Sequence, residues 1–130
     1  MNPRPMLEPT ARTVEAAKAL ADFHPTIVSE VAAAVARDAV VVVGMRQNPV
    51  VKKARRALDA AAIPYTYIEH GSYLSKWKER LAIKLWTGWP TFPQVFVKGV
   101  FIGGAREMIQ AMERGDLARW IEQGPPRVEA

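Results

Sequence analysis

The sequence contains no cysteine and only two histidines among its 130 residues. Without cysteine the chain can form no disulfide and has no thiolate of its own to act as a nucleophile or a metal ligand. His24 and His70 lie far apart on different predicted elements, so they predict no metal site. The usual clue that cysteine content gives to the redox compartment is also missing.

Long apolar runs are lacking as well. No uninterrupted stretch is long enough to span a bilayer, and residues 1–6 have no apolar core of the signal-peptide kind. We therefore expect a cytoplasmic protein without a membrane partner. What is present is ordinary for one soluble domain, with 49% hydrophobic and 24% charged residues. The net charge of +5 fits either an anionic ligand or a well-solvated basic surface.

Hydrophobic periodicity and the positions of proline and glycine divide the chain into elements. Helices are predicted over residues 10–22, 26–37, 49–62, 74–86, 105–113 and 116–122. Strands are predicted over residues 40–43, 65–69, 94–97 and 100–102. The order βαβαββα, preceded by helices, predicts an α/β fold in which helices flank a small mixed sheet. The domain division is a tail with an extra helix over 1–23, one domain over 24–123, and a C-terminal tail over 124–130.

The start of the 49–62 helix is unusually well marked. Asn48 is a favoured N-cap, because its side-chain oxygen accepts a hydrogen bond from a free backbone N–H, and Pro49 suits the first helical position. A cysteine at this place would have its pKa lowered by the helix dipole. An amide cannot ionise, so a plain helix cap is a sufficient interpretation of this pair.

Two further segments carry functional signal. Residues 89–95 read Trp-Pro-Thr-Phe-Pro-Gln-Val, with two prolines just before a strand. A cis Phe92–Pro93 bond would turn the backbone groups of Phe92 outward to pair with an extended peptide-like ligand, although the rarity of cis bonds favours trans. Gly103 and Gly104 separate a strand from a helix. Bare N–H groups there can bind a carboxylate or phosphate, and the alternative is a simple tight turn.

Three tryptophans, Trp77, Trp86 and Trp89, cluster near the 74–86 helix, where aromatic side chains are usually core residues. Basic residues interleaved with aromatics can also indicate single-stranded nucleic acid. The sequence has no recognisable nucleic-acid-binding motif, so we expect no such partner.

These features have a familiar arrangement. From about residue 26 to 122 the sequence resembles the glutaredoxins, and most closely their monothiol branch. Residues 89–104 look like the signature Trp-Pro-Thr-Tyr/Phe-Pro-Gln…Gly-Gly of that family. The resemblance implies a thioredoxin-like, mixed four-stranded sheet, here with an extra N-terminal helix, and a cis bond before Pro93.

The resemblance also implies a binding site for glutathione. Phe92 and Pro93 would pair with its cysteinyl unit, and the helix start at Gly104, Ala105 and Arg106 would receive its γ-glutamyl carboxylate. The remaining implied contacts are basic side chains. They are Arg46, just ahead of the catalytic motif, and Arg80 and Lys84 for the glycyl carboxylate.

The catalytic motif departs from the family. Where glutaredoxins carry Cys-Pro-Tyr-Cys or Cys-Gly-Phe-Ser, residues 48–51 read Asn-Pro-Val-Val, and the longer monothiol loop is missing. Asn48 stands at the position of the nucleophile, so no catalytic residue is assigned. Thiol–disulfide exchange requires a thiolate. A family-type iron–sulfur cluster requires a protein thiolate, so no cluster is expected.

Three functions remain open. The chain binds glutathione, or a γ-glutamyl or peptide ligand, without turnover, in thiol-redox or iron–sulfur related physiology. Alternatively, it is a repurposed scaffold in which the basic 49–62 helix or the extra N-terminal helix docks a protein partner. The third is a glutathione-dependent oxidoreductase whose thiol comes from a substrate or partner.

Overall fold

A computed structural model describes residues 3–72 and 74–128. A four-stranded sheet lies at its centre, with strand order β2-β1-β3-β4. The strands are β1 (Val40–Gly44), β2 (Thr66–Glu69), β3 (Gln94–Val97) and β4 (Val100–Gly103). Only β1 and β2 run parallel; the other two pairs are antiparallel. The predicted mixed sheet is thus confirmed. The extreme ends of the two predicted tails, residues 1–2 and 129–130, lie outside the described residues.

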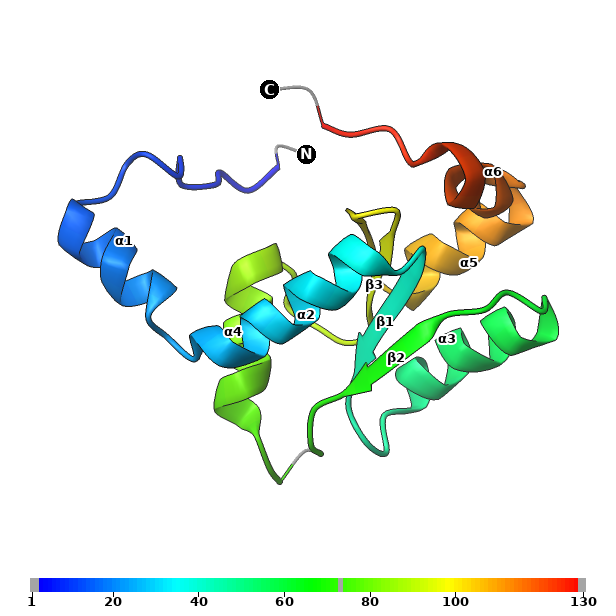
Figure 1. Cartoon of the computed structure of the whole chain (residues 1–130), viewed down its shortest axis with the longest axis horizontal. Helices are drawn as coiled ribbons and strands as arrows, with labels where there is room; N and C mark the ends of the chain where they lie inside the picture. The colour runs from blue at the N-terminus through cyan, green and yellow to red at the C-terminus, as the bar shows by residue number, and fades with distance from the viewer. Residues whose placement is uncertain (1–2, 73, 129–130) are drawn as a thin grey trace.

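Helices cover both faces of this sheet (Figure 1). One face carries α2 (Pro25–Arg37) and α4 (Trp77–Thr87). The other carries α3 (Pro49–Ala60) and α5 (Ala105–Glu113), with α6 (Asp116–Gln123) packed on α5. The extra N-terminal helix, α1 (Val14–Ala21), lies to the side of α2 and α4 and away from the sheet (Figure 1).

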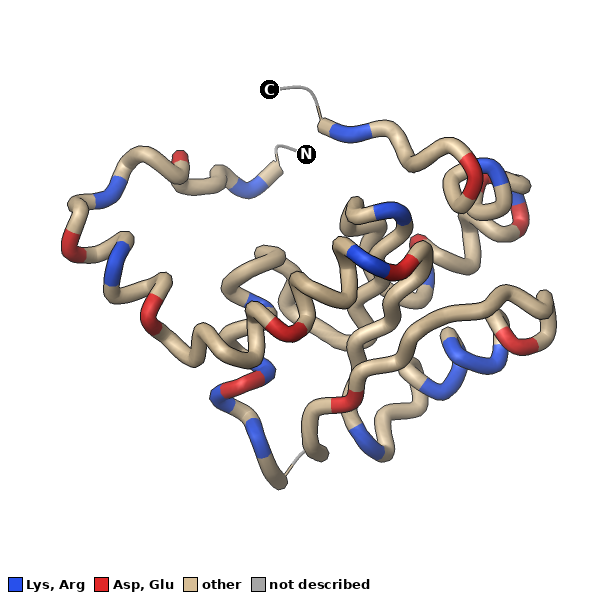
Figure 2. The backbone as a smooth tube through the Cα atoms, viewed as in Figure 1, with Lys and Arg blue, Asp and Glu red and all other residues tan. Residues whose placement is uncertain are grey.

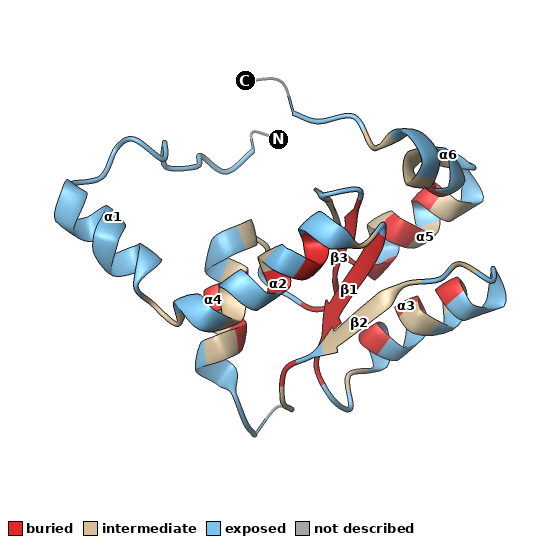
Figure 3. Ribbon diagram, viewed as in Figure 1, coloured by how far each residue is buried: buried red, intermediate tan, exposed pale blue. Residues whose placement is uncertain are grey.

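The valine run of β1 explains why helices lie on both faces. Val41 and Val43 pack into the apolar cluster formed with α2 and α4. Val40 and Val42 belong to the cluster formed with α3 and α5. A strand that is apolar at every position is expected where both of its faces are covered. Figure 3 shows this strand buried along its length.

The strand directions bring four segments to one edge of the sheet. β1 and β2 both end at this edge because they are parallel. β3 begins there, since Val43 pairs with Gln94, and β4 ends there, since Val95 pairs with Gly103. The starts of α3 and α5, the loop after β2 and the loop before β3 therefore meet at this edge, which we call the C-terminal edge of β1.

Two helices begin later than the sequence predicted. α1 starts at Val14 rather than residue 10, because the hydroxyl of Thr13 accepts a hydrogen bond from the N–H of Ala16 at 3.1 Å and fixes the cap there. α4 starts at Trp77 rather than residue 74. Ser72 N–H donates to the Ser75 hydroxyl at 3.1 Å, and Ser75 N–H donates to Ser72 O at 3.1 Å. Such local bonds favour a turn over a helix.

The prediction that the tryptophans are core residues is wrong for two of them. Trp77 is 60% exposed and Trp86 is 42% exposed. Trp86 stacks on Phe96, with ring centroids 5.6 Å apart, but its outer face remains open. Val50, an apolar residue in the first turn of α3, is also exposed.

Candidate functional site

The start of α3 is capped by the side chain of Asn48, the residue that the resemblance places at the position of the nucleophile. Asn48 Oδ1 accepts hydrogen bonds from Val50 N at 2.9 Å and from Val51 N at 3.0 Å. Pro49 occupies the first helical position. The predicted cap is confirmed. The donors that would stabilise a thiolate here are used by an amide oxygen instead.

Asn48→Ala should lower the free energy of unfolding by about 1 kcal/mol, because two helix N–H groups lose their acceptor. Asn48→Asp should keep the stability near that of the unchanged chain, since the carboxylate caps the same groups and complements the helix dipole. Urea unfolding of the three proteins at neutral pH measures both effects. Equal stability of the alanine and aspartate variants would contradict the role of this cap.

The loop before β3 holds the second part of the site. The Phe92–Pro93 peptide bond is cis, so the trans expectation from bond statistics was wrong, and the cis form implied by the resemblance is present. Both residues are buried. Within the described part of the chain, neither the N–H nor the C=O of Phe92 has a hydrogen-bond partner. Those two groups are the ones an extended ligand would pair with.

Gln94 fixes this loop from within the core. It is fully buried, and its Nε2 donates to Trp89 O at 3.1 Å and to Thr91 O at 3.3 Å. Its Oε1 accepts from the hydroxyl of Thr87 at 2.8 Å. A buried amide with all these partners gives the loop one conformation. The sequence motif contained Gln94, but its role as a clamp was not predicted.

The start of α5 lies directly against this loop. A Cβ added to Gly104 would lie 3.4 Å from Pro93 O and 3.5 Å from Trp89 Nε1. The preceding Gly103 has φ +111°, and a Cβ there would lie 2.7 Å from Glu107 Cγ. Gly103 is therefore required by its φ and by close approach, whereas a Cβ on Gly104 would fit at ordinary contact distances. The structure brings Phe92, Pro93, Gly104 and Ala105, all of them buried, to one place; we use the name cis-proline groove for these four residues, after the glutathione site that the resemblance implies.

One residue of this groove was not assigned a contact from the sequence. Glu107 Oε1 accepts a hydrogen bond from Gly104 N at 2.9 Å, and Glu107 Oε2 lies 3.6 Å from Arg106 Nε. The signal for it was available, because an acidic residue three places after an N-cap is the second half of a capping box.

The two basic residues implied to bind one carboxylate have different surroundings. Arg80 is only 7% exposed. Its Nη1 donates to His70 O at 3.0 Å and also to Ser75 O. It thus ties down the loop after β2. Lys84 points elsewhere, with its Nζ 5.7 Å from the centre of the Phe92 ring. Of the pair, Lys84 is the cation beside the cis-proline groove.

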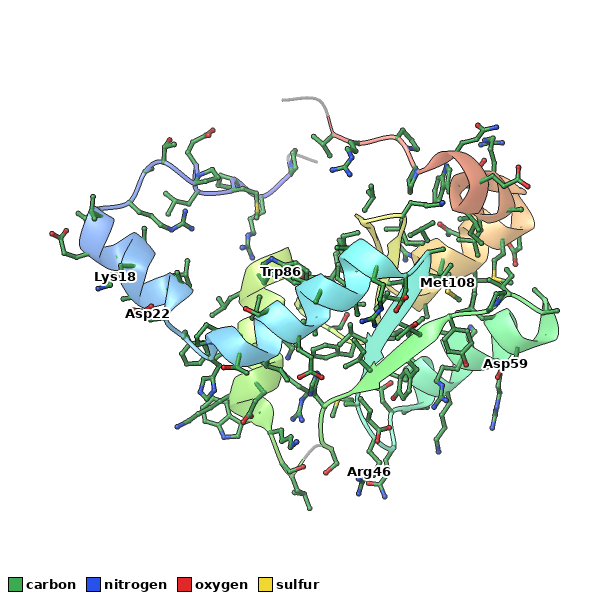
Figure 4. The ribbon with its side chains drawn as sticks, in the orientation of Figure 1. Lys18, Asp22, Arg46, Asp59, Trp86 and Met108 are labelled. Atoms are coloured by element: carbon green, nitrogen blue, oxygen red, sulfur yellow. The ribbon has the colours of Figure 1, made fainter. Side chains whose placement is uncertain are left out.

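Arg46 follows the end of β1 and projects outward from the loop toward solvent (Figure 4). Its Nε lies 3.7 Å from Glu69 Oε2. Glu69 also accepts a hydrogen bond from the hydroxyl of Tyr67 at 3.0 Å, and burial, followed by this bond, raises the pKa of Tyr67 to about 12. The exposed pair of Arg46 with Glu69 is weak, so the guanidinium is free to move to an anionic ligand.

His70 should make stability depend on pH. Its side chain is buried, and its Nε2 has no hydrogen-bond partner among the residues described. Burial lowers the pKa of His70 below its usual 6.5, helped by Lys76 and Arg80 and opposed by Glu30 and Glu79. The unfolded chain therefore takes up a proton that the folded chain resists. The free energy of unfolding should fall as pH decreases below about 6.5.

Urea unfolding at about pH 7.5 and about pH 5.5 measures this effect, with His70→Asn as the comparison. We expect the loss of stability on acidification to be smaller in the variant. An identical loss in both proteins would show that His70 is not its source.

The site offers no family-type metal chemistry of its own. Within residues 3–72 and 74–128, no three His, Cys, Asp or Glu side chains are grouped so as to hold a metal ion. A cluster held by a protein thiolate does not fit Asn48, whose oxygen accepts hydrogen bonds from the helix start.

Within residues 3–72 and 74–128, no helix has the length and apolar character needed to cross a membrane.

The mixed sheet, the cis-proline loop and the glycine-led α5 define a protein of the thioredoxin fold. The glutaredoxin family model matches residues 40–102, from β1 to β4. The "Glutaredoxin-like protein" of Dictyostelium discoideum is 40% identical over 108 residues, which cover 83% of this chain and 88% of that protein. The chain therefore belongs to the glutaredoxin family.

Other relatives agree with this family. The "Uncharacterized monothiol glutaredoxin ycf64-like" of Synechocystis sp. is 35% identical over 65 residues, covering 50% of this chain and 58% of that protein. The crystal structure of a buckwheat glutaredoxin–glutathione complex has a TM-score of 0.67 and 21% identity, covering 87% of this chain and 96% of that one. This structural likeness concerns the fold. The chain is thus a glutaredoxin-like protein that contains no cysteine.

Proposed function

We propose that this protein binds glutathione, or a γ-glutamyl or related peptide, in the cis-proline groove and does not exchange thiols with it. The observation that carries the proposal is the unpaired backbone of Phe92 next to the start of α5. Paired N–H and C=O groups give affinity for an extended peptide without demanding a particular side chain. A short peptide can therefore pair with Phe92 and reach the helix start.

The charges around the groove support an anionic peptide. The first N–H groups of α5, those of Ala105 and Arg106, have no hydrogen-bond partner in the described part of the chain. A helix start with free N–H groups favours negative charge. Lys84 contributes a cation beside Phe92. Membership of the glutaredoxin family, one member of which was solved as a glutathione complex, points to the same ligand.

The missing thiol supports binding without turnover. Thiol–disulfide exchange proceeds by attack of a thiolate on a disulfide sulfur, and Asn48 offers an amide that already caps α3. A bound glutathione thiol would meet no protein thiol, because the chain contains no cysteine. The proposal places this binding in thiol-redox or iron–sulfur related physiology and keeps the cytoplasmic location expected from the sequence.

Calorimetric titration with reduced glutathione tests the proposal, with Gly104→Val as the blocked variant. A valine side chain would extend from a Cβ that already lies 3.4 Å from Pro93 O, so it fills the space between the loop and α5. Gly104→Ala is the folding control, because its Cβ fits at ordinary contact distances and its backbone conformation suits any residue.

We expect saturable binding of millimolar glutathione that Gly104→Val abolishes and Gly104→Ala largely keeps. Equal binding by all three proteins would place the ligand elsewhere. Turnover of a glutathione mixed disulfide by the unchanged chain would instead support an enzyme that uses a thiol supplied by its substrate or partner.

A second candidate function, a protein-interaction scaffold, is favoured by an apolar groove of about 470 Å³ beside α1. None of the residues of α1 is buried. The groove is lined by α1, α2, α4 and the adjoining segments, and its largest apolar side chains are Leu20, Phe23, Val28, Leu85 and Trp86. Its occupant would be an apolar segment of a protein partner. A purified partner should then lose affinity for Leu85→Glu and keep it for Gly104→Val, whereas the reverse pattern would assign that partner to the cis-proline groove.

A further inference from the structure

The groove beside α1 gathers large apolar side chains that remain exposed. Leu20 of α1 and Leu85 and Trp86 of α4 line it, and all three are exposed. Exposed apolar side chains that lie together mark a surface that a ligand or a partner covers. A short helix without tertiary packing is marginal in water, and α1 buries none of its residues. An occupant of this groove would therefore also stabilise α1.

The size and the walls of the groove favour a small molecule. Its volume of about 470 Å³ lies within the range of small-molecule pockets, about 300–1,000 Å³. A helix with its side chains is about 10 Å wide and rises about 5.4 Å per turn, so such a volume encloses about one turn. The walls are mainly α1, α2 and α4, and backbone groups inside helices are already paired. An extended peptide would leave its own amides without partners there, whereas a hydrocarbon chain has no amides to satisfy.

One cation lies at this groove. Among the described residues that line it, Arg12 is the single charged one. Its Nη1 donates to Glu8 O at 3.4 Å and to Pro9 O at 3.2 Å. In the part of the chain that the structure describes, its Nε and Nη2 have no hydrogen-bond partner, and Arg12 forms no ion pair. The free N–H groups of this planar fork suit a carboxylate.

The other charges of this segment do not line the groove. Figure 2 shows positive and negative residues following one another along residues 12–22, and Arg12 alone among them belongs to the lining. Burying a charged head group without a partner is costly. A ligand that enters this groove with a charge should therefore be an anion, with its charge at Arg12.

We propose that the groove beside α1 binds a fatty-acid-like carboxylate, whose apolar chain lies between α1 and α4 and whose carboxylate meets Arg12. The apolar side chains supply most of the affinity, because an exposed ion pair contributes little. Arg12 makes the site prefer an anionic head group to a neutral or cationic one. This site shares no lining residue with the cis-proline groove, so the inference does not depend on glutathione binding. It assigns to the groove a small molecule in place of the protein segment of the second candidate function.

Three probes with the same hydrocarbon chain and different head groups test the unchanged protein. They are decanoate, decanol and decylamine, titrated by calorimetry at neutral pH and low salt, below the concentrations at which they form micelles. We expect saturable binding of decanoate, about fivefold weaker binding of decanol, and the weakest binding of decylamine.

Arg12→Gln tests the head-group contact. It should weaken decanoate binding about fivefold and leave decanol binding unchanged, because only the carboxylate uses the guanidinium. Lys18→Gln removes the same charge from a position of α1 that does not line the groove. This control should leave the binding of both probes unchanged.

Leu85→Glu tests the apolar wall. A carboxylate in place of Leu85 should abolish binding of decanoate and decanol alike. Leu74→Glu makes the same change at a side chain that is 97% exposed and lies outside the groove, and it should leave both affinities unchanged. Both leucines are exposed, so neither substitution removes a core side chain.

Each of the other results would overturn the inference. Equal binding of decanoate and decanol, with no effect of Arg12→Gln, would remove the carboxylate from the ligand class. Binding that Leu85→Glu retains would place the ligand elsewhere. If none of the probes binds, the groove takes no such ligand, and a protein partner that Leu85→Glu releases would keep the second candidate function. Gly104→Val should bind decanoate unchanged, so a failure of glutathione binding is distinguishable from a failure of this site.

Discussion

Asn48→Cys should produce a thiol that ionises at least about one pKa unit below the ordinary 8.5 of cysteine. The substituted sulfur would lie at the start of α3, where Asn48 now accepts from Val50 N and Val51 N. These N–H groups and the helix dipole favour the thiolate over the thiol. Because the chain contains no other cysteine, the pH dependence of iodoacetamide alkylation reports this single group directly.

The other end of the same helix supplies the control. Ala61 is the exposed C-cap of α3, where the dipole opposes negative charge. A thiol placed there by Ala61→Cys should titrate at or above the ordinary value. If the two thiols titrate alike, Asn48 does not occupy the electrostatic position that the family uses for its nucleophile.

Gln94→Leu should lower the free energy of unfolding by about 3 kcal/mol. Leucine fills similar space but removes the donor to Trp89 O and Thr91 O and the acceptor for Thr87. The loop before Pro93 then loses its clamp, so ligand binding in the cis-proline groove should weaken as well. Thermal and urea unfolding measure the first effect, and calorimetry with glutathione measures the second.

The exposed Gln110 of α5 provides the comparison for Gln94. Gln110→Leu makes the same chemical change at the surface and should alter stability by less than about 0.5 kcal/mol. A Gln94→Leu protein as stable as this control would show that the buried amide does not organise the loop.

The sequence predicted the fold well because several independent signals agreed. The four valines of β1 are continuous, as a strand covered on both faces requires. The Asn48 cap marks the start of α3, and the Lys98-Gly99 turn marks the end of β3 and the start of β4. Both turn residues adopt the left-handed conformation, with φ +50° at Lys98 and +80° at Gly99. Boundaries failed where local side-chain bonds compete with a helix, as Ser72 and Ser75 do ahead of α4.

The sequence predicted some residues of the candidate site better than others. The motif identified Phe92, Pro93 and Gly104, and the cis bond before Pro93 is the feature there that depends on a particular residue type. It could not distinguish Arg80 from Lys84, since both are basic residues on one helix. Only tertiary packing shows that Arg80 faces the carbonyls of the loop after β2 and that Lys84 lies beside Phe92.

The exposed tryptophans show a different limit. Periodicity indicates which residues of a helix share a face, but it does not show how far the neighbouring elements extend to cover them. α1 does not pack closely against α4. Trp86 of α4 (labelled in Figure 4) therefore lines an open groove and not a closed core. The sequence of a helix with no buried residue, such as α1, does not indicate which element it packs against.

The measurement that tests the central claim most directly is an amide NMR titration of the unchanged chain with reduced glutathione. Binding in the cis-proline groove predicts saturable shifts of the Phe92, Gly104 and Ala105 amides, with those of α1 left in place. Shifts confined to the groove beside α1, or none at millimolar glutathione, would contradict glutathione binding in the cis-proline groove of this cysteine-free glutaredoxin-like protein.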